Sequence, residues 1–365
     1  MLLQARKNRY MKPFGPVFDA LEAAVLGMEE MTEGDPHCVD GLDIKRYMTV
    51  VIIGLMPAVA AAVLAFGPRM LAVIMVSYVF GGLVEVSFAM ARKKGIHEGF
   101  LVTGLIFPLT LPPTVPLWIV AVGVAAGTLF GKEVFGGTGR NVFNPALVGR
   151  LFVTIAFPSI MTTSWQVPGS DAVTSATPLV MYKTGQTATA LSHLLLGQAP
   201  GSMGEVFRIG LIAGGIFVIW TRVSEWRIPV SYLGSVAVLS ALGHYALPGR
   251  VAPPLFQLFA GGLMLGAFFM ATDPVTSPFT RPGKWVFGTM CGLLTVLIRG
   301  FSGYVEGVMF SIVIMNSLAP LIDHMVLKTT FRPRRPTPAG TASPAAGVAC
   351  ANCTCGAAAG GGKEE

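Results

Sequence analysis

An ionisable side chain inside an apolar segment is the first feature of this sequence that could do chemistry. Glu85 lies in the run GGLVEVSF, within a long hydrophobic stretch. A carboxylate at bilayer depth is costly, so Glu85 is a functional candidate unless a buried arginine or backbone donors pair with it. Gly81 and Gly82, one turn earlier, remove two side chains beside it. They leave space for a ligand or for close helix packing.

A connection rich in glycine and asparagine is a second candidate site. Residues 132–146 read KEVFGGTGRNVFNPA. Gly136 and Gly137 permit close approach to a flat or anionic ligand, and Asn141 and Asn144 offer both donors and acceptors. The connection lacks the strand-to-helix setting of a dinucleotide fingerprint and the Lys-Ser/Thr pair of a P-loop. It predicts a ligand loop, with a tight turn between helices as the alternative.

A polar segment in the second half of the chain has a similar role. Residues 271–280 read ATDPVTSPFT and interrupt an apolar region at Asp273. Broken helices at matched positions in two halves point to a central ion or substrate site. Asp323, near the end of the last apolar stretch, is a third acid of this kind. The alternative for Asp323 is an interfacial residue beside His324.

The composition excludes a water-soluble enzyme. The 365 residues are 53% hydrophobic and 12% charged, against roughly 25% charged in an ordinary soluble domain. The formal charge of +7 could indicate nucleic acid, but Lys and Arg are scattered between apolar runs instead of forming one patch. We therefore expect a membrane protein that binds lipid and no nucleic acid.

Ten apolar stretches have roughly the 17–25 residues that a helix needs to cross the hydrocarbon core. The third contains Pro108, Pro112 and Pro113, so we expect it to be broken or re-entrant and covered by protein. The stretches are 48–66, 70–91, 99–115, 117–135, 146–162, 206–222, 228–247, 255–271, 284–301 and 304–326.

The distribution of basic residues predicts that both termini lie in the cytoplasm. That orientation places most Lys and Arg inside, as the positive-inside rule requires. The ten spans divide into five plus five around the polar segment 163–205, which predicts an all-α, polytopic inner-membrane protein built as an inverted repeat. The outer side keeps few basic residues, chiefly Arg69, Lys183, Arg208, Arg250 and Arg299.

Two terminal segments flank the predicted membrane domain, which covers 47–326. Residues 1–46 form a cytoplasmic segment whose apolar spacing over 16–31 predicts an amphipathic helix. Residues 327–365 turn basic and then rich in Ala, Gly and Cys, as in a disordered tail. Cys350, Cys353 and Cys355 could bind a metal ion, but they lack a fourth ligand and a fold to hold them.

Several motifs together resemble one known family. They are GGLVEV at 81–86, KEVFGGTGRNVFNPALVGR at 132–150, DAVTSATPL at 171–179, FFMATDPVTSPFT at 268–280 and APLIDH at 319–324. The chain resembles, from about residue 40 to 326, the family that contains the NqrB subunit of sodium-translocating NADH:quinone oxidoreductases and the RnfD subunit of Rnf complexes. The N-terminal extension and the segment HEGFLVTGLIFPLTLPPTVPLW at 97–118 are more similar to the quinone reductase.

The resemblance implies a covalent flavin. On residue chemistry alone, DAVTSATPL reads as a Ser/Thr-rich turn. In this family, however, a threonine of the pattern D-x-x-[ST]-[GS]-A-T carries FMN through a phosphoester, and a separate flavin transferase attaches it. The matching residue is Thr177, with Asp171, Ser175 and Ala176 completing the pattern. The predicted outer position of this loop agrees with modification outside the cytoplasm.

The resemblance implies three further sites. We expect a noncovalent riboflavin beside the 132–146 connection, a quinone beside the glycine pair, and a sodium path along the acids, whose oxygens suit a hard cation. The residues are, in that order, Gly136, Gly137, Asn141 and Asn144; Gly81 and Gly82; and Glu85, Asp273 and Asp323.

The expected function is that of a flavin-bearing membrane subunit of an ion-translocating oxidoreductase. It would pass electrons from NADH, through partner subunits, to quinone while sodium crosses. Because the cofactors supply the redox chemistry, we expect no catalytic side chain. Two alternatives remain: the RnfD subunit of an Rnf complex, which joins ferredoxin oxidation to NAD reduction without a quinone site, and a flavin-free channel or secondary transporter.

Overall fold

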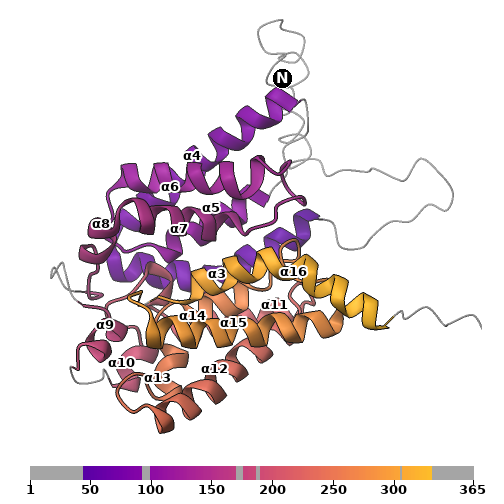
Figure 1. The fold of residues 1–365 in the computed structure, drawn as a ribbon. Coiled ribbons are helices and arrows are strands. Elements are labelled where there is room, and N and C mark those ends of the chain that lie inside the picture. The colour runs from indigo at the N-terminus through magenta and orange to yellow at the C-terminus, as the bar shows by residue number, and fades with distance from the viewer. Residues whose placement is uncertain (1–43, 93–98, 170–175, 186–189, 305, 331–365) are drawn as a thin grey trace, which may run out of the picture.

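The computed structural model describes residues 44–92, 99–169, 176–185, 190–304 and 306–330, with side chains from Tyr47 onward. This part of the chain is helical and has no β-strand (Figure 1). The predicted amphipathic helix over 16–31 and the cysteine-containing tail lie outside the described residues. The predicted domain boundaries therefore stay predictions.

The helices of the first half include a π-helical turn, and the helix that follows it begins with a capping residue. They are α3 (Ile44–Phe66), α4 (Arg69–Arg92), α5 (Gly99–Thr110), α6 (Leu117–Thr128), the π-helical η2 (Leu129–Glu133), α7 (Pro145–Ala156) and α8 (Pro158–Thr163). Asn144 accepts a hydrogen bond from the backbone of Ala146 and precedes a proline in the first turn of α7. Both features favour a helix start at this position.

The second half begins with short helices. After these, the longer helices α11 and α12 and the long helices α15 and α16 are separated by further short elements. They are α9 (Pro178–Lys183), α10 (Leu191–Leu195), η3 (Met203–Glu205), α11 (Arg208–Trp220), α12 (Arg227–Ala246), α13 (Pro254–Phe259), α14 (Leu263–Leu265), the π-helical η4 (Gly266–Met270), α15 (Arg281–Phe301) and α16 (Val308–Thr330). Thr280 caps α15 by accepting from the backbone of Gly283.

Four of the described helices are long and apolar enough to cross a membrane: Tyr47–Phe66, Arg69–Arg92, Arg281–Phe301 and Val308–Thr330. The shorter helices Gly99–Thr110, Pro145–Ala156 and Arg208–Trp220 are also apolar. Large apolar side chains stand exposed on the long helices, among them Leu64, Met75, Leu83, Val238 and Leu321, as expected of a lipid-facing surface. The membrane class is supported, whereas the count of ten spans stays a prediction.

The third predicted stretch is broken, as its prolines indicate. Pro108 lies inside α5, which ends at Thr110, and the chain then runs without helix through Pro112 and Pro113 until α6 begins at Leu117. Protein groups cover the freed backbone: Met203 N donates to Leu111 O at 3.1 Å, and Arg69 donates to the carbonyls of Thr114 and Val115. Buried irregular backbone of this kind is tolerated at membrane depth.

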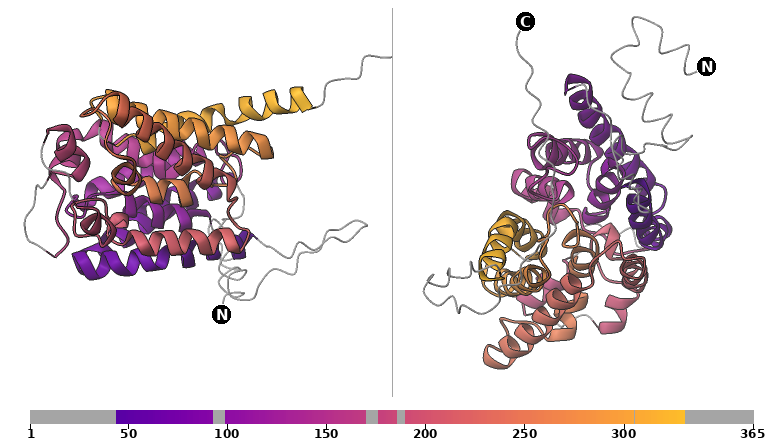
Figure 2. Two further views of the ribbon diagram at one scale, coloured as in Figure 1. Left: turned by 90° about the horizontal axis from the view of Figure 1, so that it is seen from below. Right: turned by 90° about the vertical axis from the view of Figure 1, so that its right-hand side faces the viewer.

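The two halves meet between α3 and α11. Helix α3 packs against α11, α4 against α5 and α6, and α12 against α13 and α15. Long helices α15 and α16 run side by side, and the end of α16 extends beyond the bundle (Figure 2). The start of α3 and the end of α16 lie at one end of the bundle, opposite α9 (Figure 1).

Candidate functional site

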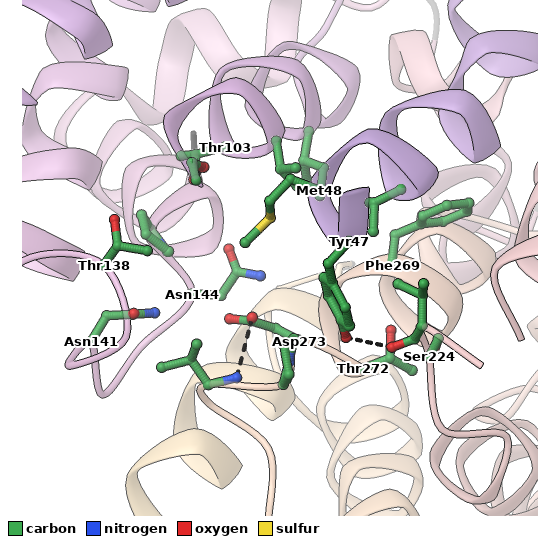
Figure 3. Close-up of a pocket in the computed structure, with 18 of the residues that line it drawn as sticks. Tyr47, Met48, Thr103, Thr138, Asn141, Asn144, Ser224, Phe269, Thr272 and Asp273 are labelled. Atoms are coloured by element: carbon green, nitrogen blue, oxygen red, sulfur yellow. Dashed lines mark hydrogen bonds between the residues drawn. The ribbon is translucent and has the colours of Figure 1, made fainter. Parts of the chain in front are cut away.

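A cavity opens between the two halves, at the end of the bundle where α3 begins. Its walls come from α3, α5, the connection after η2, and the turn after η4 (Figure 3). Asn144, Thr138 and Asp273 carry the polar part of the lining, and Phe269 and Met48 the apolar part. The space between the lining residues is about 720 Å³, a value that includes the open mouth.

The two asparagines of the connection differ in how much of their amide is already bonded. Asn144 caps α7 through Oδ1, and its Nδ2 makes a long contact of 3.5 Å to Met270 O in η4. Asn144 therefore ties the connection of the first half to the π-helix of the second. Asn141 donates from Nδ2 to Phe143 O at 3.2 Å. Both line the cavity, as predicted for a ligand loop.

Gly136 and Gly137 are not in the cavity wall. Their φ angles are 121° and 96°, a region that L side chains rarely adopt. A Cβ on Gly137 would lie 3.8 Å from Glu133 Oε1. The structure thus explains these glycines by the backbone turn that they make. The next residue, Thr138, lines the cavity, and its buried Oγ1 has no hydrogen-bond partner.

Asp273 stands in the turn between η4 and α15 and faces the cavity. Its carboxylate accepts from Thr276 Oγ1 at 3.1 Å and from Val275 N at 3.4 Å. The surrounding protein desolvates it, and this burial raises the pKa of Asp273 above its usual value, while the bond from Thr276 lowers it. The carboxyl group is therefore partly satisfied and still able to take a cation.

Glu85 has a buried partner. Lys132 Nζ lies 2.7 Å from Glu85 Oε2, and the two side chains are 4% and 6% exposed. The alternative of a buried ion pair is thus realised, with lysine in the place expected for arginine. A second pair lies beside it, since Arg92 donates to Glu133 Oε2 at 3.4 Å and to Glu133 O at 2.7 Å.

The glycine pair next to Glu85 divides between packing and space. A Cβ on Gly81 would meet Val124 at 3.2 Å and Thr128 at 3.7 Å, so Gly81 lets α4 approach α6 closely. A Cβ on Gly82 would have only Phe100 within 4 Å, at 3.9 Å. Helix packing therefore accounts for Gly81, whereas Gly82 is not tightly packed.

Asp323 is bonded to the start of α15. Its Oδ2 accepts from Phe279 N at 2.6 Å, and its Oδ1 from Thr280 N at 3.0 Å and Thr280 Oγ1 at 2.5 Å. It is absent from the cavity lining that contains Asp273. A cation at Asp323 would have to displace these donors.

Thr177 begins α9 at the opposite end of the bundle (Figure 1). It occupies the N-cap position of α9, yet its side chain makes no capping hydrogen bond, and it is half-buried. Ala176 is exposed. Asp171 and Ser175 lie outside the described residues. Lys183 anchors α9 by donating to Ser302 O at 2.9 Å and Tyr304 O at 3.2 Å.

A second cavity is lined by Arg150, Glu205, Arg299 and Glu306, whose bonding partners the sequence did not show. Arg150 pairs with Glu306 at 2.8 Å, and Arg208 pairs with Glu205 at 3.2 Å. Arg299 donates to Gln257 O at 2.7 Å and to Ala260 O at 3.0 Å. Single basic residues in apolar runs were the available signal, and only the packing showed what they bond.

Comparison with known proteins gives one consistent result. The model of the NQR2, RnfD, RnfE family matches residues 31–332. Relatives named for the NqrB subunit of the Na(+)-translocating NADH-quinone reductase include one from Pseudomonas aeruginosa, 35% identical over 90% of this chain and 94% of the relative. Another from Azotobacter vinelandii is 34% identical over 87% and 93%. One from Klebsiella pneumoniae is 38% identical over 71% and 66%.

Proposed function

Because this chain belongs to the NQR2, RnfD, RnfE family, we propose that it is the flavin-bearing membrane subunit of a bacterial sodium-translocating NADH:quinone oxidoreductase. The observation that carries this proposal is the match to the NqrB subunit of Pseudomonas aeruginosa over 94% of that protein. Its place is the inner membrane, in a complex with other subunits that bring electrons from NADH.

Thr177 is the proposed attachment point of FMN. The hydroxyl of the half-buried Thr177 makes no capping hydrogen bond, and a flavin transferase would join it to the phosphate of FMN. Flavin supplies one- and two-electron transfer when bound. The role of this chain is to hold the attachment segment against the end of α15, where Lys183 donates a hydrogen bond to Ser302 O.

The cavity at the other end is the proposed site of the noncovalent riboflavin. Thr138 presents a buried hydroxyl without a partner, and Asn141 lines the same cavity. An unpaired buried polar group is unfavourable, so a ligand that bonds it gains free energy. Asn144, Asn141 and Thr138 would orient the ring, and Phe269 and Met48 would exclude water from it.

Quinone and sodium have proposed places around the same end. Gly81 and Gly82 are the proposed place of a quinone, and the loose packing around Gly82 supports it. Glu85, Asp273 and Asp323 are the proposed oxygen ligands of the sodium path, with Asp273 the one that faces the cavity. Sodium binding at Glu85 requires that Lys132 move away, and sodium binding at Asp323 requires that the donors to its carboxylate be displaced.

An inverted repeat of five plus five elements is the proposed architecture. The packing order supports it: α4 contacts α5 and α6, as α12 contacts α13 and α15, and α6 contacts α7, as α15 contacts α16. Both termini are proposed to be cytoplasmic, in agreement with the common end of the bundle at which α3 starts and α16 finishes.

The test of the function is an assay of the complex that contains this chain. Membrane vesicles should oxidise NADH with quinone and take up ²²Na⁺ during turnover. Activity between ferredoxin and NAD, without quinone reduction, would instead identify the Rnf subunit, which the matching family also includes. Sodium movement without any redox activity would favour the transporter.

A further inference from the structure

Lys132 connects the proposed cation ligand Glu85 with the wall of the cavity. Its ammonium lies 2.7 Å from Glu85 Oε2, and the same side chain lines the cavity with Asn141 and Asn144. Both members of the pair are almost fully buried. The Lys132 ammonium therefore borders two sites. In the proposed function, an electron arrives in the cavity and a sodium ion arrives at the Glu85 carboxylate.

The backbone at Lys132 has an unusual form. Lys132 belongs to η2, a single π-helical turn, and such turns occur frequently at functional sites. Gly131 presses this turn against α7, since a Cβ there would lie 2.8 Å from Pro145 Cα. The turn is therefore fixed, and any movement of the ammonium has to come from the flexible side chain.

A second acceptor for the ammonium is present on the cavity side. A Cβ on Gly99 would lie 3.6 Å from Lys132 Nζ and 3.5 Å from Thr138 Oγ1. The two polar atoms thus border the same point, which the missing side chain of Gly99 leaves free. Thr138 Oγ1 is buried and has no partner. It can accept a hydrogen bond from an ammonium that leaves Glu85.

The charges around Glu85 balance to zero. Glu85 and Glu133 are negative, and Lys132 and Arg92 are positive. A sodium ion added to Glu85 would leave one uncompensated positive charge in a poorly solvated place, which is strongly unfavourable. Sodium can bind there only if the ammonium withdraws and a negative charge arrives nearby. The cavity that Lys132 lines is where such a charge would arrive.

We propose that Lys132 is a positioning residue that couples electron arrival in the cavity to sodium binding at Glu85; this inference rests on the proposed function. With no added charge, the ammonium stays on Glu85 and excludes sodium. One electron, supplied by NADH through the partner subunits and accepted by the flavin proposed for the cavity, would draw the ammonium toward Thr138 and free Glu85 for one sodium ion. When the electron passes on, Lys132 returns to Glu85 and displaces the ion.

Linkage makes this coupling measurable in either direction. If electron arrival tightens sodium binding, sodium must raise the affinity of the cavity for the electron by the same factor. A tenfold coupling corresponds to about 59 mV for a one-electron step. The midpoint potential of the noncovalent flavin in the purified complex should therefore rise when NaCl replaces choline chloride.

The deciding experiment is a potentiometric titration of the complex, followed by visible absorbance, in both salts. Lys132→Met should abolish the sodium-dependent shift, and Lys132→Arg, which keeps the charge, should retain part of it. Thr138→Val should reduce the shift, measured in the fraction of the complex that retains the noncovalent flavin. An undiminished shift in the Lys132→Met complex would overturn the inference. A wild-type complex with no noncovalent flavin would instead overturn the proposed function.

Thermal unfolding of the oxidised complex gives a second readout that needs no electron transfer. Lys132→Met leaves Glu85 without its partner, so sodium, but not choline, should raise the melting temperature of this variant. The wild type and the double variant Glu85→Gln with Lys132→Met should show no such rise. If the Lys132→Met complex does not assemble, the substitute measurement is whether it assembles in ~1 M NaCl. Salt at this concentration also screens exposed charges, so the double variant serves as the control. If sodium changes neither the melting temperature nor the assembly of the Lys132→Met complex, the idea of a sodium site masked by Lys132 is refuted.

Discussion

Gly54 of α3 and Gly214 of α11 touch through their backbones. A Cβ on Gly214 would fall 1.9 Å from the carbonyl oxygen of Gly54, and a Cβ on Gly54 would fall 2.6 Å from Val218. No side chain separates the first helices of the two halves at this crossing. Small residues commonly provide such close approach between membrane helices.

Replacing Gly214 by alanine should destabilise the subunit. The added methyl group would meet backbone atoms, which cannot rotate away, so the two helices must separate. Overpacking of this kind typically costs about 1–3 kcal/mol. The measurement is the thermal unfolding of the complex in detergent. Gly234→Ala in α12 is the matched control, because its Cβ has open space, and equal melting temperatures for both variants would contradict the prediction.

Thr177→Ala should remove the covalent flavin. After co-expression with a flavin transferase and denaturing electrophoresis, the wild-type band should fluoresce under ultraviolet light and the variant band should not. Thr184→Ala is the control, since its hydroxyl bonds backbone carbonyls at the end of the same helix. A fluorescent Thr177→Ala band would place the attachment elsewhere.

Sodium activation should depend on pH through Asp273. Burial raises its pKa, so the carboxyl group keeps its proton to a higher pH than a free aspartate does. Sodium binds the ionised form, and sodium affinity should therefore rise as pH increases through the raised pKa and fall below it. The measurement is the sodium concentration for half-maximal NADH:quinone activity across the acidic and neutral pH range.

Two variants of this turn sharpen the pH prediction. Thr276→Ala removes a hydrogen bond that lowers the pKa of Asp273, so the transition should move to higher pH. Asp273→Asn should flatten that component of the pH dependence. A transition at the same pH in wild type and Thr276→Ala would assign it to another group.

Arg299→Met should destabilise the second half strongly. The guanidinium supplies donors to Gln257 O, Gln257 Oε1 and Ala260 O, where the helix between 254 and 270 is interrupted. Each buried acceptor left without a partner costs roughly 1–3 kcal/mol. Thermal unfolding is the measurement. Arg250→Met, an exposed arginine predicted on the same side, should change stability little, and a similar loss in both variants would argue against the carbonyl role.

The basic residues predicted for the outer side show how a sequence pattern and a structural role can differ. In the sequence, the scarcity of these residues on one side serves only to predict the orientation of the chain in the membrane. In the structure Arg69, Lys183, Arg208 and Arg299 each donate to backbone carbonyls at helix ends or breaks. Irregular backbone at this depth needs donors, so these side chains are retained for bonding that no count of charges predicts.

The two polar connections show a similar limit. Both line one cavity, as expected if they form a common site. In order along each half, however, 271–280 follows the third predicted span, 255–271, and 132–146 follows the fourth, 117–135. Similar composition makes them look equivalent in the sequence. Their meeting depends on how α3 and α11 bring the halves together, which is a property of packing.

Local features were determined by the sequence alone. Long apolar runs require lipid, Pro112 and Pro113 cannot continue α5, and Asn144 followed by Pro145 starts a helix, because each effect acts within a few neighbouring residues. Tertiary structure decided the partners: Lys132 for Glu85, and the start of α15 for Asp323. Such pairs depend on which helix faces lie together in space, and residues 47 positions apart leave no periodic trace of it.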